Sequence, residues 1–332
     1  MKTLLIGNFG SGNIGDELIL SQALEKHPEV VVMTVNGEFS QEFCGRKLET
    51  IPFPPTGLRS GLHYLFSAGY RRELNSIVGK VDKVVFPGGG LFAIKFRACL
   101  LWFLVFVWAR KLKCPIEFTH QGVDESLGIF SRILTRFVLS RSDKITVRDE
   151  VSVRSVRNLC GKNVENRGDL VQEIKTEVSS PKEKLILVNA RSKFALDNLN
   201  KRFGDYKKIF VAFDKTDQKF ASNLEVIYPQ TRREVLDLFR KAEYVVGERL
   251  HFLILGEIFC GSDKTFVLQE PYAEKVQSFC SDKGIRNYLS SVKGVMSSRF
   301  SNKENIFFST KYYSIIFINF YFIVTIFFKF SF

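Results

Sequence analysis

The chain has 332 residues, and its 48 Lys and Arg against 35 Asp and Glu give a formal net charge of +13. This length exceeds one ordinary compact core and suits two domains. The positive charge favours an anionic partner such as nucleic acid, a membrane surface or a phosphorylated small molecule. The basic residues are scattered, and no helix-turn-helix, RNP or zinc-finger spacing occurs, so we expect no nucleic-acid partner.

The six Cys residues are far apart, form no C-x-x-C pair and have no His placed to complete a zinc site. This pattern is typical of reduced thiols and predicts no metal. The first residues read at once as a β-strand, without the basic and then apolar stretches of a secretory signal. We therefore expect a cytoplasmic protein, which would lie at the inner face of the cytoplasmic membrane if its apolar C-terminus is an anchor.

Apolar strand-like runs alternate with helix-like segments through the first half of the chain. The runs are residues 2–6, 30–35, 83–86, 116–120 and 144–147. This periodicity is typical of βαβ units and predicts a parallel sheet covered on both faces. We assign residues 1–174 to an N-terminal Rossmann-like lobe.

The polar stretch 175–184, with Ser-Ser-Pro at its centre, predicts a linker. Residues 185–306 then repeat the alternation and predict a second Rossmann-like lobe. Its predicted strands are residues 185–189, 209–213, 224–227, 244–247 and 265–268. The fold class is therefore α/β, with two parallel sheets, a ligand cleft between the lobes and functional residues in the loops that follow strands.

Two apolar segments need an explanation. Residues 98–109, "ACLLWFLVFVWA", are flanked by Arg97 and Arg110 and are shorter than the roughly 20 residues that span a bilayer, which predicts a buried helix. The C-terminal tail, residues 307–332, is apolar and long enough to cross a membrane. Membrane association, packing against the body of the protein and an extension without function all stay open for this tail.

The first strand is followed by "GNFGSGNIGDE", which contains the G-x-G-x-x-G pattern at Gly10, Gly12 and Gly15. In dinucleotide-binding proteins such a turn places a pyrophosphate at a helix N-terminus. Here Asp16 and Glu17 follow at once, and their carboxylates would repel a pyrophosphate although they stabilise the helix. We therefore expect no dinucleotide cofactor. Asp16 either caps the helix, or one of the two carboxylates is offered to a hydroxyl group.

Two further loops carry candidate site residues. Gly88, Gly89 and Gly90 follow a predicted strand and form either a tight structural turn or a set of bare N–H groups facing a ligand. Arg249 and His251 come after a strand of the second lobe and begin an apolar helix. Arg clamps a carboxylate or phosphate with two parallel hydrogen bonds, and His is a natural proton donor near neutral pH. The pair predicts anion binding and proton transfer at the cleft.

Seven pieces of the sequence occur together in one order. They are "GNIGDELIL", "FPGGGLF", "QGV", "ITVRDEVSVRSV", Gly168-Asp169, "GERLHFLILGE" and "YAEKVQSFCSDKGI". In this order, across roughly residues 2–285, the chain resembles the polysaccharide pyruvyl transferases, whose architecture is GT-B-like. The resemblance implies an enzyme that moves pyruvate from phosphoenolpyruvate to a sugar of a cell-surface polysaccharide or its lipid-linked precursor. It implies a pyruvyl ketal as product and requires no cofactor.

The resemblance also implies roles for individual residues. Arg249 and His251 would meet phosphoenolpyruvate, while Arg148 of "VRDE" and Arg191 of "NARSK" would add positive charge. His251 would protonate the methylene carbon, and Asp16 or Glu17 would deprotonate the sugar hydroxyl. The other predicted substrate-binding residues are Gly12, Asn13, Gly15, Gly88, Gly89, Gly90 and Gln121.

The sequence departs from the family pattern at Asp124-Glu125, where Gly-Pro is common, and at Ala93-Ile94, where the family has a polar pair. Glu248 also places a carboxylate beside the expected anion clamp. Two other classes therefore stay open: a GT-B glycosyltransferase that uses a nucleotide sugar, and a catalytically silent, membrane-attached binding protein.

Overall fold

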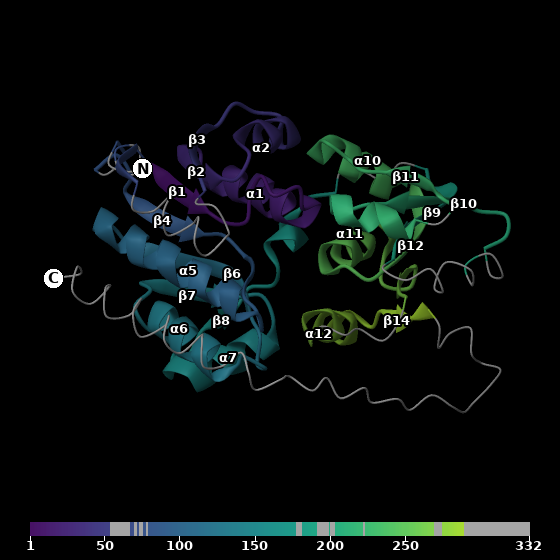
Figure 1. The fold of residues 1–332 in the computed structure, drawn as a ribbon. Helices are drawn as coiled ribbons and strands as arrows, with labels where there is room; N and C mark the ends of the chain where they lie inside the picture. Colours follow the sequence, from purple (N-terminus) through teal and green to yellow (C-terminus); the bar gives the residue numbers. More distant parts are fainter. Residues whose placement is uncertain are drawn as a thin grey trace, which may run out of the picture. The chain divides into compact units, whose positions relative to one another are not determined.

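The computed structural model describes two parallel sheets with helices packed on them (Figure 1). It describes residues 1–53, 67–69, 72, 76–77, 79–176, 181–190, 199, 203–221, 223–268 and 274–288. The predicted site residue Arg191 and the apolar tail 307–332 lie outside this part of the chain. Among the residues described, no helix is long and apolar enough to cross a membrane.

The first sheet has, within the described residues, eight strands in the order β3-β2-β1-β4-β6-β7-β8, with β5 pairing with β6. The strands are β1 (Thr3–Ile6), β2 (Val30–Thr34), β3 (Glu49–Pro52), β4 (Lys83–Phe86), β5 (Gly89–Phe92), β6 (Ile116–Val123), β7 (Lys144–Val147) and β8 (Glu165–Asn166). The helices are α1 (Ile14–Lys26), α2 (Gly37–Cys44), α5 (Phe96–Ala109), α6 (Ile129–Ser140) and α7 (Glu150–Cys160), with the short 3₁₀ helices η1 (Arg110–Leu112) and η2 (Leu170–Glu173).

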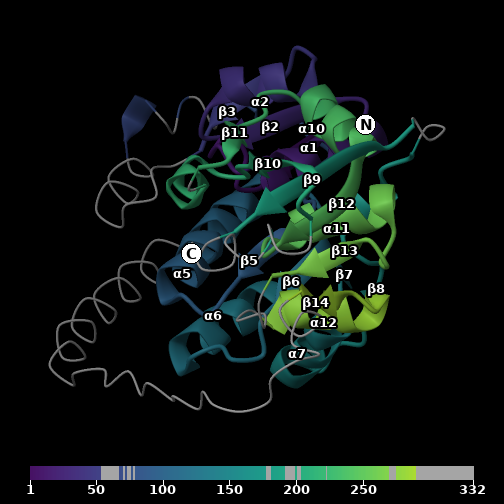
Figure 2. The same cartoon turned by 90° about the vertical axis from the view of Figure 1, so that its right-hand side faces the viewer.

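The second sheet has, in the same described part, six strands in the order β11-β10-β9-β12-β13-β14. The strands are β9 (Glu183–Asn189), β10 (Lys207–Val211), β11 (Glu225–Ile227), β12 (Ala242–Gly247), β13 (Thr265–Val267) and β14 (Arg286–Asn287). The helices are η3 (Lys215–Phe220), α10 (Arg232–Lys241), α11 (Leu250–Cys260) and α12 (Glu274–Lys283). Figure 2 shows β9, β12, β13 and β14 side by side in this order.

Every strand pair described in the two sheets is parallel, which confirms the predicted fold class. Each sheet reverses its strand order once, between β1 and β4 in the first and between β9 and β12 in the second. In doubly wound sheets, ligands bind at the carboxyl ends of the strands beside such a reversal. The predicted linker 175–184 lies between β8 and β9, except for its last two residues, which begin β9.

Helix α1 is capped by Asn13, whose side-chain oxygen accepts a hydrogen bond from the N–H of Gly15 at 3.1 Å. Asn is among the best N-cap residues because its side chain satisfies an N–H group that has no partner within the helix. Asp16 lies inside the first turn, so of the two alternatives for this residue the structure excludes capping of the helix. Its carboxylate is available for another role.

Helix α5 confirms the helix predicted over residues 98–109. Half of its residues are buried, and they pack in an aromatic core, where the rings of Phe86 and Phe118 stack at 4.2 Å and Trp102 meets Phe86 edge-on at 6.3 Å. Aromatic pairs in stacked or edge-to-face geometry add stability beyond the area that they bury.

One apolar core cluster joins buried residues of the two sheets with residues of α1, η2, α10 and α11. Polar contacts also join the two parts. The hydroxyl of Tyr228 donates to the carbonyl of Gly12 at 2.7 Å, and the N–H of Ile14 donates to the carbonyl of Phe213 at 2.8 Å. The glycine-rich turn after β1 therefore docks onto the second lobe.

Candidate active site

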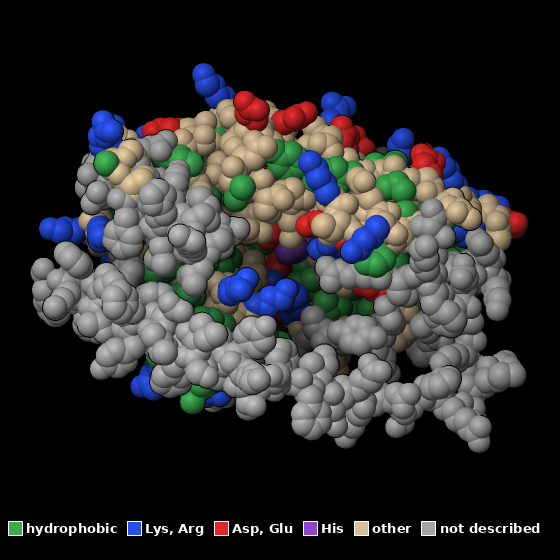
Figure 3. Space-filling view, viewed as in Figure 1, with side chains coloured by type: hydrophobic (Ala, Val, Ile, Leu, Met, Phe, Trp, Pro, Cys, Tyr) green, Lys and Arg blue, Asp and Glu red, His purple; other side chains and the backbone are tan. Residues whose placement is uncertain are grey.

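A cavity of about 510 Å³ lies where the carboxyl ends of strands from both sheets meet. Its cationic side chains are Arg148, which follows β7, Arg249, which precedes α11, and Lys275 on α12. Figure 3 shows basic, acidic and histidine side chains together in a hollow near the middle of the view. The structure thus brings together residues that are far apart in the sequence, several of them in the strand-following loops where we expected functional residues.

His251, in the first turn of α11, packs against Gly15 in the first turn of α1. A Cβ atom on Gly15 would overlap the imidazole at Nδ1, so only glycine leaves room for the ring at this position. The neighbouring N–H of Ile14, which a dinucleotide turn would offer to a phosphate, already donates to Phe213. Gly15, the last glycine of the G-x-G-x-x-G pattern, therefore leaves room for the imidazole of His251 from the other lobe.

We expect Gly15→Ala to lower the free energy of unfolding by about 1–3 kcal/mol, the usual effect of overpacking, although Ala favours a helix more than Gly does. In a His251→Ala background the same substitution should be neutral or stabilising, because the overlap is gone. Denaturant unfolding of the two single variants and the double variant measures this coupling. Equal destabilisation in both backgrounds would contradict the contact.

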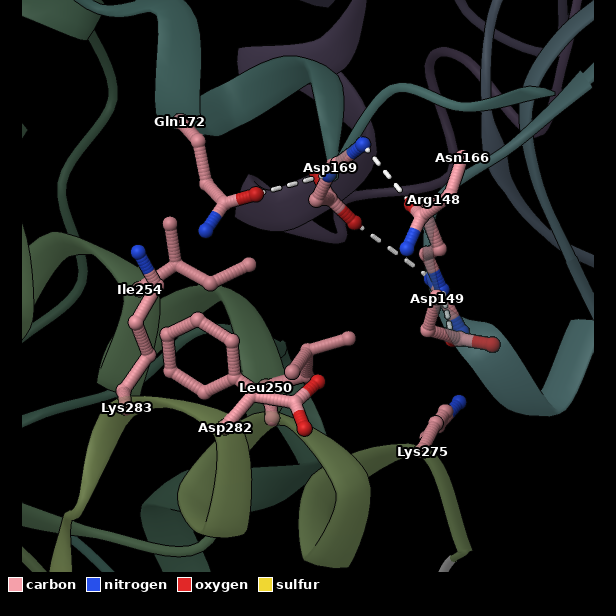
Figure 4. Close-up of a pocket in the computed structure, with 12 residues that line it drawn as sticks. Arg148, Asp149, Asn166, Asp169, Gln172, Leu250, Ile254, Lys275, Asp282 and Lys283 are labelled. Atoms are coloured by element: carbon pink, nitrogen blue, oxygen red, sulfur yellow. Dashed lines mark hydrogen bonds and ion pairs between the residues drawn. The ribbon is translucent and has the colours of Figure 1, made fainter.

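His251 also faces Asp169, the first residue before η2. Its Nε2 lies 3.5 Å from Oδ2 of Asp169, and the same oxygen lies 3.4 Å from Nη1 of Arg148. Figure 4 shows Asp169 pointing toward Arg148, with this contact dashed. Burial raises the pKa of Asp169, but His251, Arg148 and the N–H of Val171 outweigh it and hold this pKa well below its usual range. Asp169 is therefore a charged carboxylate that lies beside both His251 and Arg148.

Arg148 has a nearly buried side chain held by two carboxylates. Its Nε lies 3.3 Å from Asp149, in addition to the contact with Asp169. A Cβ atom on Gly122 would overlap the guanidinium, so the glycine of "QGV" gives Arg148 its place. A buried charge is stable only when it is paired, and these pairs fix the direction of the side chain.

Arg249 is oriented by Asp217 of η3. Its Nε and Nη2 donate to the two carboxylate oxygens of Asp217, both at 2.6 Å, in a bidentate pair. Asp217 itself is held by the N–H of Phe213 at 3.2 Å. Because the pair uses one edge of the guanidinium, the other edge keeps donors for a ligand. Glu248, which the sequence places beside the clamp, also lines the cavity.

Asp16 lines the cavity and accepts a hydrogen bond from Nδ2 of Asn8 at 2.9 Å. Burial raises the pKa of Asp16 above its usual value, and Asn8, His251, Lys275 and Arg249 lower it only in part. A carboxylate with a raised pKa is a stronger base than an ordinary one. Asn13 also lines the cavity, and its role in substrate binding stays a prediction.

Glu17 points away from the cavity. Its carboxylate accepts hydrogen bonds from the N–H of Gly10 at 2.5 Å and the hydroxyl of Ser40 at 3.0 Å, and the residue is fully buried. Burial raises its pKa from 4.5 to about 7. This geometry assigns Glu17 to holding the glycine-rich turn, so we leave it out of the proposed chemistry.

Glu17 should make stability depend on pH. Because its pKa is raised on folding, the folded state favours the proton, and this stabilisation is lost as the pH rises from 4.5 to about 7. We expect the unfolding free energy of the wild type, relative to Glu17→Gln, to fall by about 3 kcal/mol across this window. Urea unfolding of both proteins at several pH values measures it. Parallel curves would contradict the buried carboxyl.

The three consecutive glycines have different surroundings. Gly88 and Gly89 adopt φ values of +127° and +92°, which side chains rarely tolerate, and Gly90 lines the cavity beside Arg148 and Lys275. The segment is not only a turn, because residues 89–92 form β5. Gly12 faces Tyr228, so its carbonyl serves the contact between lobes.

Gln121 does not reach the cavity. It lies within β6, is fully buried and donates through Nε2 to the carbonyl of Phe86 at 2.8 Å. The loop expected after residue 120 begins later, because β6 continues to Val123. The prediction that Gln121 binds substrate is not supported by this geometry, and its contacts tie β6 to β4.

Four residues of the site carried no predicted role: Asn8, Asp169, Asp217 and Lys275. Asn8 lies two residues after the end of β1, in a strand-following loop where functional residues are expected, so its position in the sequence could have indicated a role. Asp169 occurs in the quoted Gly168-Asp169 element without an assigned function. Asp217 and Lys275 resemble the many other charged residues of the chain, and only the fold brings them to the cavity.

A smaller cavity of about 260 Å³ adjoins the first (Figure 4). Both cavities are lined by Arg148, Leu250 and Lys275, so these residues form the wall between them. Asp169 lines the smaller cavity while its carboxylate approaches His251 of the larger one.

The two parallel sheets and their shared cavity define a two-lobed α/β protein with a GT-B-like fold. A family model for polysaccharide pyruvyl transferases matches residues 13–262. The chain therefore belongs to the polysaccharide pyruvyl transferase family and is a transferase that modifies polysaccharides. No curated protein matches it.

Solved structures with a similar fold include UDP-GlcNAc 2-epimerases. The enzyme from Methanocaldococcus jannaschii, with UDP-GlcNAc and UDP, is 18% identical with a TM-score of 0.53, covering 97% of this chain and 100% of that one. The enzyme from Neisseria meningitidis, bound to UDP-GlcNAc, is 15% identical with a TM-score of 0.54, covering 86% and 87%. S. aureus MnaA with UDP is 13% identical with a TM-score of 0.55, covering 89% and 88%. At these identities the likeness concerns the fold alone.

Proposed function

We propose that the protein transfers pyruvate from phosphoenolpyruvate to a sugar of a cell-surface polysaccharide or its lipid-linked precursor, and forms a pyruvyl ketal. The observation that carries this proposal is the grouping of Arg148, Arg249 and Lys275 around His251 in one cavity. A small acid with both a carboxylate and a phosphate needs several cations, and the reaction needs a proton donor beside them. Membership of the family supports the same reaction.

The donor would bind along the cationic wall. The phosphate and carboxylate of phosphoenolpyruvate would take the open edge of Arg249 together with Arg148 and Lys275. The N-terminus of α11 adds N–H groups and a favourable dipole at Leu250 and His251. The carboxylates that hold Arg148 and Arg249 keep these side chains in place before the donor arrives.

The reaction then follows from the residues around the donor. His251 would give a proton to the methylene carbon, which becomes the methyl group, while positive charge develops on the adjacent carbon. A sugar hydroxyl would add to that carbon as Asp16 takes its proton. Loss of phosphate and addition of a second hydroxyl would close the ketal. Of the two hydroxyl protons, one replaces the proton taken from the enzyme and the other leaves with the phosphate.

A second candidate is a transferase that uses a nucleotide sugar, because two of the structures with a similar fold hold UDP-GlcNAc. Such a donor also needs cations for its phosphates. A nucleotide sugar also carries a nucleoside, so the two functions can be distinguished by whether the protein binds phosphoenolpyruvate or UDP-GlcNAc.

Thermal unfolding with each donor tests the proposed function. We expect phosphoenolpyruvate at about 100 times its dissociation constant to add roughly 2.7 kcal/mol of stability, whereas UDP-GlcNAc adds little. 3-Phosphoglycerate, which has the same two acidic groups but no enol, serves as a control for charge alone. Stabilisation by UDP-GlcNAc and not by phosphoenolpyruvate would overturn the proposal.

A further inference from the structure

One wall of the larger cavity is apolar, and binding of the anionic donor does not account for it. The wall consists of Leu91 on β5 with Ala98, Leu101 and Trp102 on α5. The last three have helical spacing of i, i+3 and i+4, so they lie on one face of the helix. Ala98 and Leu101 are only half-buried, whereas Trp102 and six other residues of α5 are buried in the core.

Trp102 gives this wall a rigid aromatic surface. Its side chain is held edge-on by the rings of Phe53 at 5.5 Å and Phe86 at 6.3 Å, and the residue is only 5% exposed. A side chain held by such neighbours keeps its orientation when a ligand binds, which lowers the entropy that binding costs.

Amide and carboxylate groups line the same cavity beside β5. Asn8, Asn13 and Asp16 line the cavity from the segment between β1 and the first turn of α1. These groups donate to and accept from hydroxyls. A sugar ring has apolar C–H faces and hydroxyls around its edge, so it needs an apolar wall beside polar groups of this kind.

Strand β5 brings this polar group next to the cations. A Cβ atom on Gly89 would lie 3.9 Å from Oδ1 of Asp16, and one on Gly90 would lie 3.6 Å from Nζ of Lys275 and 3.8 Å from Nη2 of Arg148. Asp16 and these cations therefore approach neighbouring residues of one strand and line the same cavity, where the charges of Lys275 and Arg249 act on Asp16.

We infer that Leu91, Ala98, Leu101 and Trp102 form the acceptor platform, on which the apolar face of a pyranose ring lies while its hydroxyls reach Asp16, Asn8 and Asn13. This inference rests on the proposed function and assigns the acceptor of that reaction its place. The donor and the acceptor then occupy opposite walls of one cavity. Its volume of about 510 Å³ lies within the roughly 300–1,000 Å³ of pockets that take ligands larger than a three-carbon acid.

The test uses the full chain saturated with phosphoenolpyruvate and a panel of 4-nitrophenyl galactoside, glucoside and mannoside. Binding is followed by saturation-transfer NMR, and transfer by release of phosphate. The variant is Leu101→Ala, and the matched control is Val107→Ala, which lies half-buried on the same helix outside the cavity lining.

We expect at least one glycoside to bind, and Leu101→Ala to weaken its binding and raise its KM about tenfold, while phosphoenolpyruvate binds as in the wild type. Val107→Ala should change neither. If Leu101→Ala lowers the melting temperature strongly, Ala98→Leu replaces it, because it narrows the same wall without removing packing.

Two results would overturn the platform. One is a chain that binds phosphoenolpyruvate but none of the glycosides, and the other is unchanged glycoside binding in both Leu101→Ala and Ala98→Leu. A chain that binds no phosphoenolpyruvate would instead refute the proposed function, so the two failures are distinguishable.

Discussion

The contact between His251 and Gly15 constrains much of this structure. It joins the first turns of two helices, one from each lobe, and leaves no room for a Cβ atom between them. Around it, the hydrogen bonds of Tyr228 to Gly12 and of Ile14 to Phe213 fix the glycine-rich turn against the second lobe. Asp16 follows this turn and lines the cavity, so the contacts that hold the two lobes together also position a residue of the site.

Charge within the site is balanced by pairing. The carboxylate of Asp169 lies close to both Arg148 and His251, and the carboxylate of Asp217 pairs with Arg249. Without these carboxylates the cations would be costly to bury, and with them they are oriented before a ligand arrives. The carboxylates also weaken the net positive charge, so the anion binding that we propose depends on Lys275, on the open edge of Arg249 and on the N-terminus of α11.

Much of the fold could be predicted because strands buried on both faces read as apolar runs, and ten such runs correspond to strands of the two sheets. Strand β3 was missed because its sequence, ETIP, is not an apolar run, and β5 because its glycines read as a turn. Strands β8 and β14 were missed because each has only two residues. Arg148, Arg249, His251 and Asp16 could be placed because each follows a strand. The roles of Glu17 and Gln121 could not be predicted, because the sequence does not distinguish a side chain buried in the protein from one that lines the cavity. Asp217 and Lys275 depend on contacts distant along the chain.

The most direct test of this account is turnover by a His251→Gln variant, measured as release of phosphate from phosphoenolpyruvate by ³¹P NMR in the presence of an acceptor glycoside. We expect turnover to fall roughly 10²–10⁴-fold, with the melting temperature and the dissociation constant of phosphoenolpyruvate nearly unchanged. A folded His251→Gln variant that turns over like the wild type would contradict the central role of this histidine.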